Sequence, residues 1–341
     1  MPVEMTLTLR APGRESARAM STTIQVALGA RSYPIHIAAG GLSRLGEWMR
    51  GVAPGKRVLL VADASVDPLY GDAAAASLSD AGYQVSRAQV PSGEPSKSSE
   101  QLVHVYARCV EAGLDRSSAI VALGGGVVGD RAGYAAATFL RGIRLIQVPT
   151  TLLAMVDSAV GGKTGINLPH GKNLVGAFHQ PVLVVCDPDV LGTLPPRERA
   201  AGLAEIIKYG VIRDAELFAF LEQQLPRIQA GEAAAQEHVI ARSCAIKADV
   251  VAADEHESGE RAILNFGHTL AHAIENVAGY GSYLHGEAVG IGMVYAAELS
   301  VRLKGLPATD ASRIEALVAR AGLPVRAPEL AWSALRRAMG V

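Results

Sequence analysis

The chain has 341 residues, of which 49% are hydrophobic, and its 32 basic and 33 acidic side chains give a formal net charge of −1. This composition is typical of a globular protein and argues against intrinsic disorder, a nucleic-acid partner and a membrane protein, since no apolar run approaches the roughly 18–20 residues that span a bilayer. The length exceeds what one hydrophobic core normally supports, so we expect two domains.

Residues 1–20 are predicted to form a disordered tail. They mix arginines with Glu4 and Glu15 and lack the apolar segment of a signal peptide, and the acidic residues also argue against a transit peptide, which stays an alternative. The cysteines, Cys109, Cys186 and Cys244, are too far apart for a CxxC zinc site or a disulfide framework. We therefore expect a cytoplasmic protein.

Short β-branched runs alternate with helix-length stretches over residues 21–190. This alternation predicts a parallel sheet covered by helices, which makes the first domain α/β and Rossmann-like. The expected strands are 24–26, 33–37, 57–62, 119–123, 145–148 and 182–186.

Residues 191–341 have a different texture, because their apolar residues recur at helical spacing. An all-α second domain is predicted, with helices near 203–211, 214–225, 236–252, 262–278 and 286–304. Ser312 followed by Glu315 is consistent with a capping box that opens one further helix.

A glycine-rich loop follows the expected strand at 119–123. Gly124, Gly126 and Gly129 match GxGxxG, which lets a pyrophosphate approach the backbone at a helix N-terminus. The match alone is weak, because a tight turn that requires positive φ gives the same pattern. Asp63, at the end of an earlier strand, could bind a ribose, and the polar loop 92–97 could face the same ligand. A variant nucleotide-binding domain is indicated.

The stretch 149–180 places lysines among glycines. Lys163, Lys172 and Asn173 could bind phosphate or substrate hydroxyls, since an ammonium is a mobile point charge and backbone amides can fix an anion. The alternative is two surface loops with solvated lysines.

Glutamate and histidine cluster in the second half. Glu205 and Lys208 share a helix face at i, i+3, His268 and His272 share one at i, i+4, and His285 opens a later helix. Three such ligands with an open position describe a catalytic metal site. Spacing alone favours His268 and His272 as the ligand pair, but HTLAH lacks the glutamate of HExxH, which disfavours a peptidase.

Taken together, several separated motifs resemble those of the 3-dehydroquinate synthases, cyclases of the shikimate pathway: SGEPSK, GGGVVGD, QVPTTLLAMVDSAVGGKTGIN, GKNLVGAFHQP, LPPRERAAGLAEIIKYG, ERAILNFGHTLAHAIE and HGEAV. The resemblance runs from about residue 24 to the C-terminus. It implies a homodimeric lyase that turns a small phosphorylated sugar acid, 3-deoxy-D-arabino-heptulosonate 7-phosphate, into 3-dehydroquinate and phosphate. It also implies NAD, transiently reduced in each cycle, and a divalent metal, zinc or cobalt.

The resemblance also implies residue roles. It makes Glu205, His268 and His285 the metal ligands and leaves His272 for proton transfer. The implied substrate-binding and catalytic residues are Arg141, Asp157, Lys163, Asn173, Lys208, Lys247, Arg261, Asn265 and His272. The implied cofactor-binding residues are Asp63, Ser92, Gly93, Glu94, Lys97, Gly126, Val127, Val128, Gly129, Asp130, Thr150, Thr151, Lys163, Lys172, Val190, Leu191, Gly192 and Thr193.

Three alternatives stay open: another sugar-phosphate cyclase, a metal-dependent alcohol or glycerol dehydrogenase, and a non-catalytic NAD sensor. The family pattern continues past the last residues of this sequence with a lysine that helps to bind the substrate phosphate. We therefore expect either that Arg336 or Arg337 fills that role or that phosphate binding is weakened.

Overall fold

The computed structural model describes residues 21–279 and 281–340, so the tail predicted for residues 1–20 lies outside the described residues. The strands are β1 (Thr22–Val26), β2 (Tyr33–Ile37), β3 (Arg57–Asp63), β4 (Gln84–Val90), β5 (Ala119–Gly124), β6 (Arg144–Pro149), β7 (Lys163–Leu168), β8 (Gly171–Phe178) and β9 (Leu183–Cys186). The helices are α1 (Leu45–Met49), α2 (Asp72–Asp80), α3 (Ser99–Glu111), α4 (Gly126–Thr138), α5 (Pro196–Ile212), α6 (Ala215–Gln229), α7 (Ala233–Ala253), α8 (His268–Ala278), α9 (His285–Lys304), α10 (Ala308–Arg320) and α11 (Trp332–Ala338).

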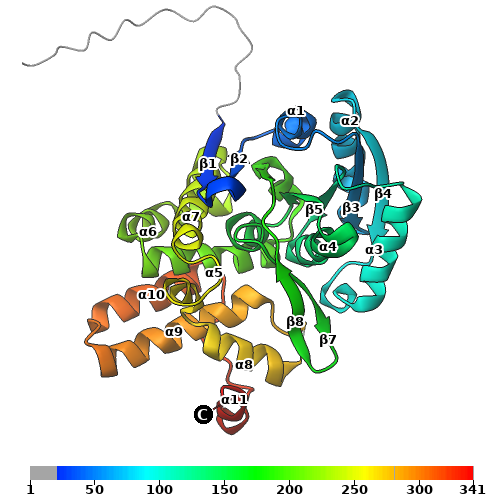
Figure 1. The fold of residues 1–341 in the computed structure, drawn as a ribbon. Coiled ribbons are helices and arrows are strands. Elements are labelled where there is room, and N and C mark those ends of the chain that lie inside the picture. Colours follow the sequence, from blue (N-terminus) through cyan, green and yellow to red (C-terminus); the bar gives the residue numbers. More distant parts are fainter. Residues whose placement is uncertain (1–20, 280, 341) are drawn as a thin grey trace, which may run out of the picture.

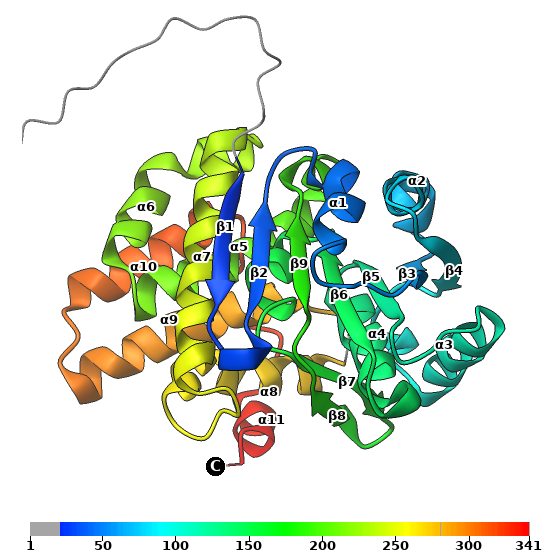
Figure 2. The same ribbon diagram turned by 45° about the horizontal axis from the view of Figure 1, so that its top comes forward.

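The first half of the chain is built on a seven-stranded sheet with the order β1-β2-β9-β6-β5-β3-β4 (Figure 2). Only β1 runs antiparallel to its neighbour, and the other pairs are parallel. Parallel strands end at one common edge, where α/β proteins bind ligands. That edge carries Asp63 at the end of β3, the loop 91–98 after β4, the glycine loop after β5 and Thr150 after β6.

Helices cover both faces of this sheet, which explains why its strands are continuous apolar runs. Along β3, Leu60 belongs to a cluster with α1 and α2, whereas Leu59 and Val61 belong to a second cluster with α3 and α4. All six residues of β5 are buried. The predicted α/β, Rossmann-like architecture of this half is confirmed.

The third and largest cluster joins the β1–β2–β9 side of the sheet to the helices of the second half. Tyr33, Ile35 and Val184 contribute from the strands, and the helices α5 to α11 pack around them. Thr22 Oγ1 of β1 donates to Glu237 Oε1 of α7 at 2.9 Å. One continuous core therefore connects the sheet to the helical half.

Residues from Pro196 to the last described residue form helices without strands, as predicted (Figure 1). The prediction of a capping box at Ser312 and Glu315 is wrong. Helix α10 already begins at Ala308, after Pro307, so Ser312 and Glu315 lie inside it. Proline fixes φ near the helical value and is favoured at helix starts, which explains the earlier beginning. Within the described ranges no helix combines the length and apolarity needed to cross a membrane.

Three strands, β4, β7 and β8, were not expected from the sequence. β4 has a mixed polar pattern because it is the edge strand of the sheet. The glycine-rich stretch 163–178 forms the antiparallel hairpin β7–β8, in which Lys163 pairs with Phe178. The hairpin extends toward α8 (Figure 1), where Lys172 Nζ lies 3.1 Å from Glu275 Oε1. The surface-loop interpretation of this stretch is therefore wrong.

Candidate active site

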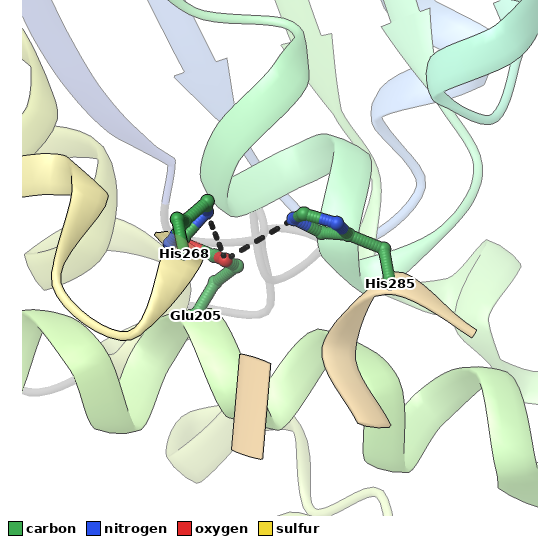
Figure 3. Close-up of side chains that lie close together, drawn as sticks. All are labelled: Glu205, His268 and His285. Atoms are coloured by element: carbon green, nitrogen blue, oxygen red, sulfur yellow. Dashed lines mark ion pairs between the residues drawn. The ribbon is translucent and has the colours of Figure 1, made fainter. Parts of the chain in front are cut away.

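Glu205, His268 and His285 point toward one another from three different helices (Figure 3). Glu205 lies inside α5, and the two histidines are the first residues of α8 and α9. The Nε2 atoms of His268 and His285 lie 3.6 and 3.7 Å from Glu205 Oε1, and one ligand atom from each residue lies within 4.8 Å of the others. The arrangement has the size and the donor types of a metal centre.

A glycine allows α8 to begin at this point. Gly267, the residue before His268, has φ +80°, which L side chains rarely adopt. A Cβ there would lie 2.7 Å from Met293 N of α9. The close approach of the two helices brings the ring centroids of His268 and His285 to 5.2 Å.

The charges around the cluster favour the metal-binding forms of two ligands. Burial would raise the pKa of Glu205, but the ammonium of Lys208, its ion-pair partner, lowers it to about 2. Burial lowers the pKa of His268 to about 4, so its ring is neutral near pH 7. Burial would also lower the pKa of His285, but the neighbouring carboxylates of Glu205 and Glu275 raise it to about 9.

His272 lies next to the cluster and outside the triad. Its ring centroid is 5.6 Å from that of His268 and 6.3 Å from that of His285. Burial lowers its pKa, so the neutral ring is available as a base. The geometry therefore groups His268 with Glu205 and His285, and the His268–His272 ligand pair favoured by spacing is not the grouping found.

The buried ammonium of Lys247 pairs with the half-buried carboxylate of Asp157 beside the triad. Lys247 Nζ of α7 donates to Asp157 Oδ1 and to its backbone oxygen, both at 2.6 Å. Tyr209 of α5 donates to the same Oδ1 at 3.0 Å. The cations Lys247 and Lys208 outweigh the burial of Asp157 and hold its pKa well below the usual range.

Glu257 joins two of the predicted substrate residues, and the sequence reasoning missed it. It accepts hydrogen bonds from Lys163 Nζ and, at 2.9 Å, from Asn265 Nδ2. Its φ of +58° is strained for a residue with a side chain. Nearby, Arg261 is buried and donates to the backbone oxygens of Glu255 and Gly161 at 2.5 and 3.2 Å.

The SGEPSK loop is tied to both α4 and the hairpin. Lys97 is 4% exposed and donates to Asp130 of α4 and to Asn173 of β8. Glu94 accepts from Asn167 Nδ2 at 2.7 Å. These bonds join the predicted cofactor-binding residues of the loop to the predicted cofactor-binding residue Asp130 of α4. They also join the loop to the predicted substrate-binding residue Asn173 of the hairpin.

Asp63 closes the turn after β3. Its Oδ1 accepts from the backbone of Ser65 and Val66 and from Ser92 Oγ, at 2.9 to 3.0 Å. Gly93 has φ +86°, so the loop turns sharply directly after Ser92. Asp63, the residue predicted to bind a ribose, is thus joined to Ser92 at the start of the SGEPSK loop.

The glycine loop is shaped by close packing. Gly124, Gly126 and Gly129 do not have positive φ, so the alternative interpretation of the motif as a positive-φ turn is wrong. Instead, a Cβ on Gly126 would lie 2.9 Å from Ser158 Oγ and one on Gly129 would lie 2.8 Å from Gln147 Oε1. Val127 is half-buried and Val128 is buried, and both belong to the first turn of α4.

Two further predicted cofactor segments flank this loop. Thr150 N donates to Gly124 O at 3.0 Å, and Thr150 Oγ1 is buried without a hydrogen-bond partner. Thr151 Oγ1 accepts from Ala154 N at 3.1 Å. The turn at 190–193, with Val190 and Leu191 buried and Gly192 exposed, is anchored by the Tyr70 hydroxyl, which lies 2.9 Å from Val190 O and 2.6 Å from Thr193 Oγ1.

Arg141 is the predicted residue that the structure leaves apart. It is exposed, has φ +69°, and follows the C-terminal end of α4, whereas the glycine loop precedes its N-terminal end. The intervening helix has 13 residues, which corresponds to about 20 Å.

Models of the two halves of one family match the chain. "3-dehydroquinate synthase N-terminal" matches residues 87–201 and "3-dehydroquinate synthase C-terminal" matches residues 202–341. The chain belongs to the 3-dehydroquinate synthase family. The curated family member of Symbiobacterium thermophilum is 55% identical over 89% of this chain and 85% of its own length, and that of Nostoc punctiforme is 52% identical over 91% and 86%.

Solved structures of other sugar-phosphate cyclases share the fold of this family member. A 2-deoxy-scyllo-inosose synthase complexed with carbaglucose-6-phosphate, NAD+ and Co2+ has a TM-score of 0.85 at 30% identity, covering 93% of this chain and 86% of that chain. A 2-epi-5-epi-valiolone synthase from Streptomyces hygroscopicus, with NAD+ and Zn2+ bound, has a TM-score of 0.84 at 28% identity, covering 98% and 88%. A glycerol dehydrogenase from Schizosaccharomyces pombe, at 21% identity and a TM-score of 0.69, covering 88% and 80%, shares the fold alone.

Proposed function

We propose that the chain acts as a carbon–oxygen lyase that converts 3-deoxy-D-arabino-heptulosonate 7-phosphate into 3-dehydroquinate and phosphate, with NAD and a divalent metal, zinc or cobalt. The observation that carries this proposal is the triad of Glu205, His268 and His285 beside the carboxyl edge of the sheet. Identities of 52–55% to curated 3-dehydroquinate synthases favour this substrate over those of the other cyclases, which are 28–30% identical.

The triad fits a metal. Glu205 is fully buried, and neither of its carboxylate oxygens has a hydrogen-bond partner, although the Lys208 ammonium is its ion partner. A buried carboxylate without hydrogen bonds is costly, and a cation between Glu205 and the two imidazoles would compensate it. Two nitrogens and one oxygen suit zinc or cobalt, and three protein ligands leave a position for substrate.

The edge of the sheet fits NAD. The N-terminus of α4 presents free backbone amides at the glycine loop, where a pyrophosphate is favoured. The buried Thr150 Oγ1 has no protein partner at the same edge. Asp63 Oδ2 accepts none of the hydrogen bonds that close the turn, which all go to Oδ1, so it is available to a ribose hydroxyl.

When bound, the metal would polarise a substrate hydroxyl and NAD would accept a hydride from the adjacent carbon and later return it. The chain's own residues supply positioning and charge. Lys208 and Lys247 place two ammonium groups beside Asp157, where they can hold an oxygen that gains negative charge. The neutral ring of His272, at the border of the triad, can take or give a proton through a ring nitrogen.

The substrate's anionic groups would meet Lys163, Asn265 and Arg261. Glu257 now occupies Lys163 and Asn265, so an incoming phosphate or carboxylate would compete with the Glu257 carboxylate for them. Arg261 is already oriented by two backbone oxygens. A homodimeric assembly is part of the same proposal.

The test is an anaerobic assay of the purified protein with the heptulosonate phosphate, NAD and Zn2+ or Co2+. We expect phosphate and 3-dehydroquinate in equal amounts without net NADH. Net NADH from a simple alcohol would identify a dehydrogenase, and the absence of phosphate would contradict the proposal.

A matched pair of variants tests the metal centre separately. His268→Ala should lose metal and activity while it still binds NAD, because the triad and the glycine loop lie on different elements. His238→Ala is the control, since that ring packs at a tilt against Phe220, with centroids 4.3 Å apart, and is not one of the three ligands.

A further inference from the structure

Arg131, on the second turn of α4, is with Arg261 among the largest fully buried side chains of the described residues. Its Nη1 donates to the backbone oxygen of Ser96, in the SGEPSK loop. Its Nε and Nη2 are buried without hydrogen-bond partners. None of the site roles considered above uses this cation.

The polar groups near Arg131 are the Ser96 backbone oxygen and the Asp63 carboxylate, and apolar residues pack beside it. On the same helix face, Val128, Ala132 and Ala135 belong to the cluster formed with α3 and the strands. Burial lowers the pKa of Arg131 to about 10, and the nearby Asp63 carboxylate opposes this shift, so the guanidinium is charged near pH 7. Burying an arginine with two unsatisfied nitrogens costs free energy, and an apolar residue of similar volume would cost less. Core stability therefore does not explain an arginine here.

The contacts of Arg131 lead to the ligand loop. Ser96 directly precedes Lys97, which is held by Asp130, the residue before Arg131. Consecutive residues of α4 thus hold consecutive residues of the loop. The carboxylate that attracts Arg131 is Asp63, whose Oδ1 holds Ser92 at the start of the same loop.

We propose that Arg131 is a positioning residue that holds the loop 92–97 against α4. Glu94 and Lys97 of the loop, together with Asp63 at the end of β3, are then already placed for NAD. This inference rests on the proposed function, because it concerns the affinity for the cofactor. Arg131 does not touch the cofactor itself, since its nitrogens stay covered by protein. Its effect is on binding, and the reacting atoms lie on other elements.

Three variants test the proposal by calorimetric titration with NAD and by thermal unfolding. Arg131→Met should raise the Kd for NAD by about tenfold, in line with the loss of one hydrogen bond to a charged donor, with no fall in melting temperature. Arg131→Lys, which keeps one charged donor for Ser96 O, should restore most of the affinity. Val105→Ala, in the same core cluster, should lower the melting temperature and leave the Kd unchanged.

Steady-state kinetics separate positioning from catalysis. For Arg131→Met the KM for NAD should rise with the Kd, while kcat at saturating NAD stays within twofold of the wild type. A Kd for Arg131→Met within twofold of the wild type would overturn the proposal. If Arg131→Met does not fold, Arg131→Gln takes its place with the same two outcomes.

Hydrogen exchange provides a readout that needs no cofactor. Amides of residues 92–98 should exchange faster in Arg131→Met than in the wild type, and those of α7 should not change. Equal exchange in the loop would also overturn the proposal. A wild type that fails to bind NAD would instead contradict the proposed function, so the two failures are distinguishable.

Discussion

Glu275 Oε2 lies 3.6 Å from Nδ1 of His285, on the side of the ring opposite to Glu205. Lys172 of the hairpin holds the other oxygen of Glu275 at 3.1 Å. Histidine ligands commonly give their second ring nitrogen to a carboxylate, which fixes the ring and its tautomer. Glu275 is therefore the outer partner of the predicted metal ligand, and the sequence reasoning did not assign it a role.

Replacing Glu275 should weaken metal binding. Glu275→Gln keeps the volume but loses the charge, and we expect the metal affinity to fall by about 10–100-fold. Competition with a chromogenic chelator measures this change. The exposed Glu298→Gln on α9 is the control, and an unchanged affinity in Glu275→Gln would contradict the assigned role.

Lys247 should act together with Asp157. Lys247→Met removes an ammonium that donates twice to Asp157, and we expect kcat to fall at least about 100-fold. The double variant Lys247→Met, Asp157→Asn should lose less than the product of the two single losses, because each residue depends on the other. Steady-state kinetics give both quantities, with the exposed Lys304→Met as control. Independent, multiplicative losses would show that the pair does not function as a unit.

The Tyr70 hydroxyl should matter for the cofactor. Tyr70→Phe removes the two contacts that hold the turn at 190–193, and about 1 kcal/mol per lost bond corresponds to an increase of about fivefold or more in the KM for NAD. Tyr83→Phe is a matched control, since its hydroxyl donates to Ala53 O at 2.8 Å, on the α1–α2 side of the sheet. Equal KM values for the two variants would refute this prediction.

Asp214 should make the stability depend on pH. Its Oδ1 caps α6 at Leu217 N, 2.9 Å away, and its Oδ2 pairs with Arg242. Burial would raise its pKa, but these bonds outweigh it and lower the pKa below the unfolded value. The stabilisation is thus complete above the unfolded pKa of about 3.9 and is lost as the pH falls through the folded pKa.

Asp214→Ala should therefore cost about 1–2 kcal/mol in the free energy of unfolding at pH 7 and progressively less below pH 4. Urea unfolding at a series of pH values measures the difference. The exposed Asp80→Ala should show almost none. A difference between wild type and Asp214→Ala that is as large at pH 3 as at pH 7 would rule out the charged cap.

The sequence predicted the strands whose pattern reflects burial on both faces. β3 and β5 are continuous apolar runs, so their ends, and with them Asp63 and the glycine loop, were located within one residue. β4 was not predicted because an edge strand carries polar side chains. The hairpin was not predicted because glycines weaken the alternation of polar and apolar residues that marks a strand. Ser312 failed as a helix start because its motif ignores the preceding proline.

The sequence predicted the site residues that belong to a family motif. It did not predict the residues that only hold other side chains or loops in place. Glu205, His268 and His285 lie 80 residues apart at the extremes, so sequence spacing cannot measure their distance, whereas the motif resemblance grouped them. Glu257, Glu275 and Arg131 hold other side chains or loops and carry no motif of their own. Only the packing of α4, α8 and the hairpin reveals them.

The packing of β1 against α7 has a consequence for biogenesis. β1 leaves the ribosome well before its partner helix, which begins about 200 residues later, and at about 5–20 residues per second this takes on the order of ten to forty seconds. During that time the edge strand and the apolar face of β2 lack their cover and can pair with other nascent chains. The enzyme should therefore depend on chaperones during translation more than a chain whose first half closes on itself.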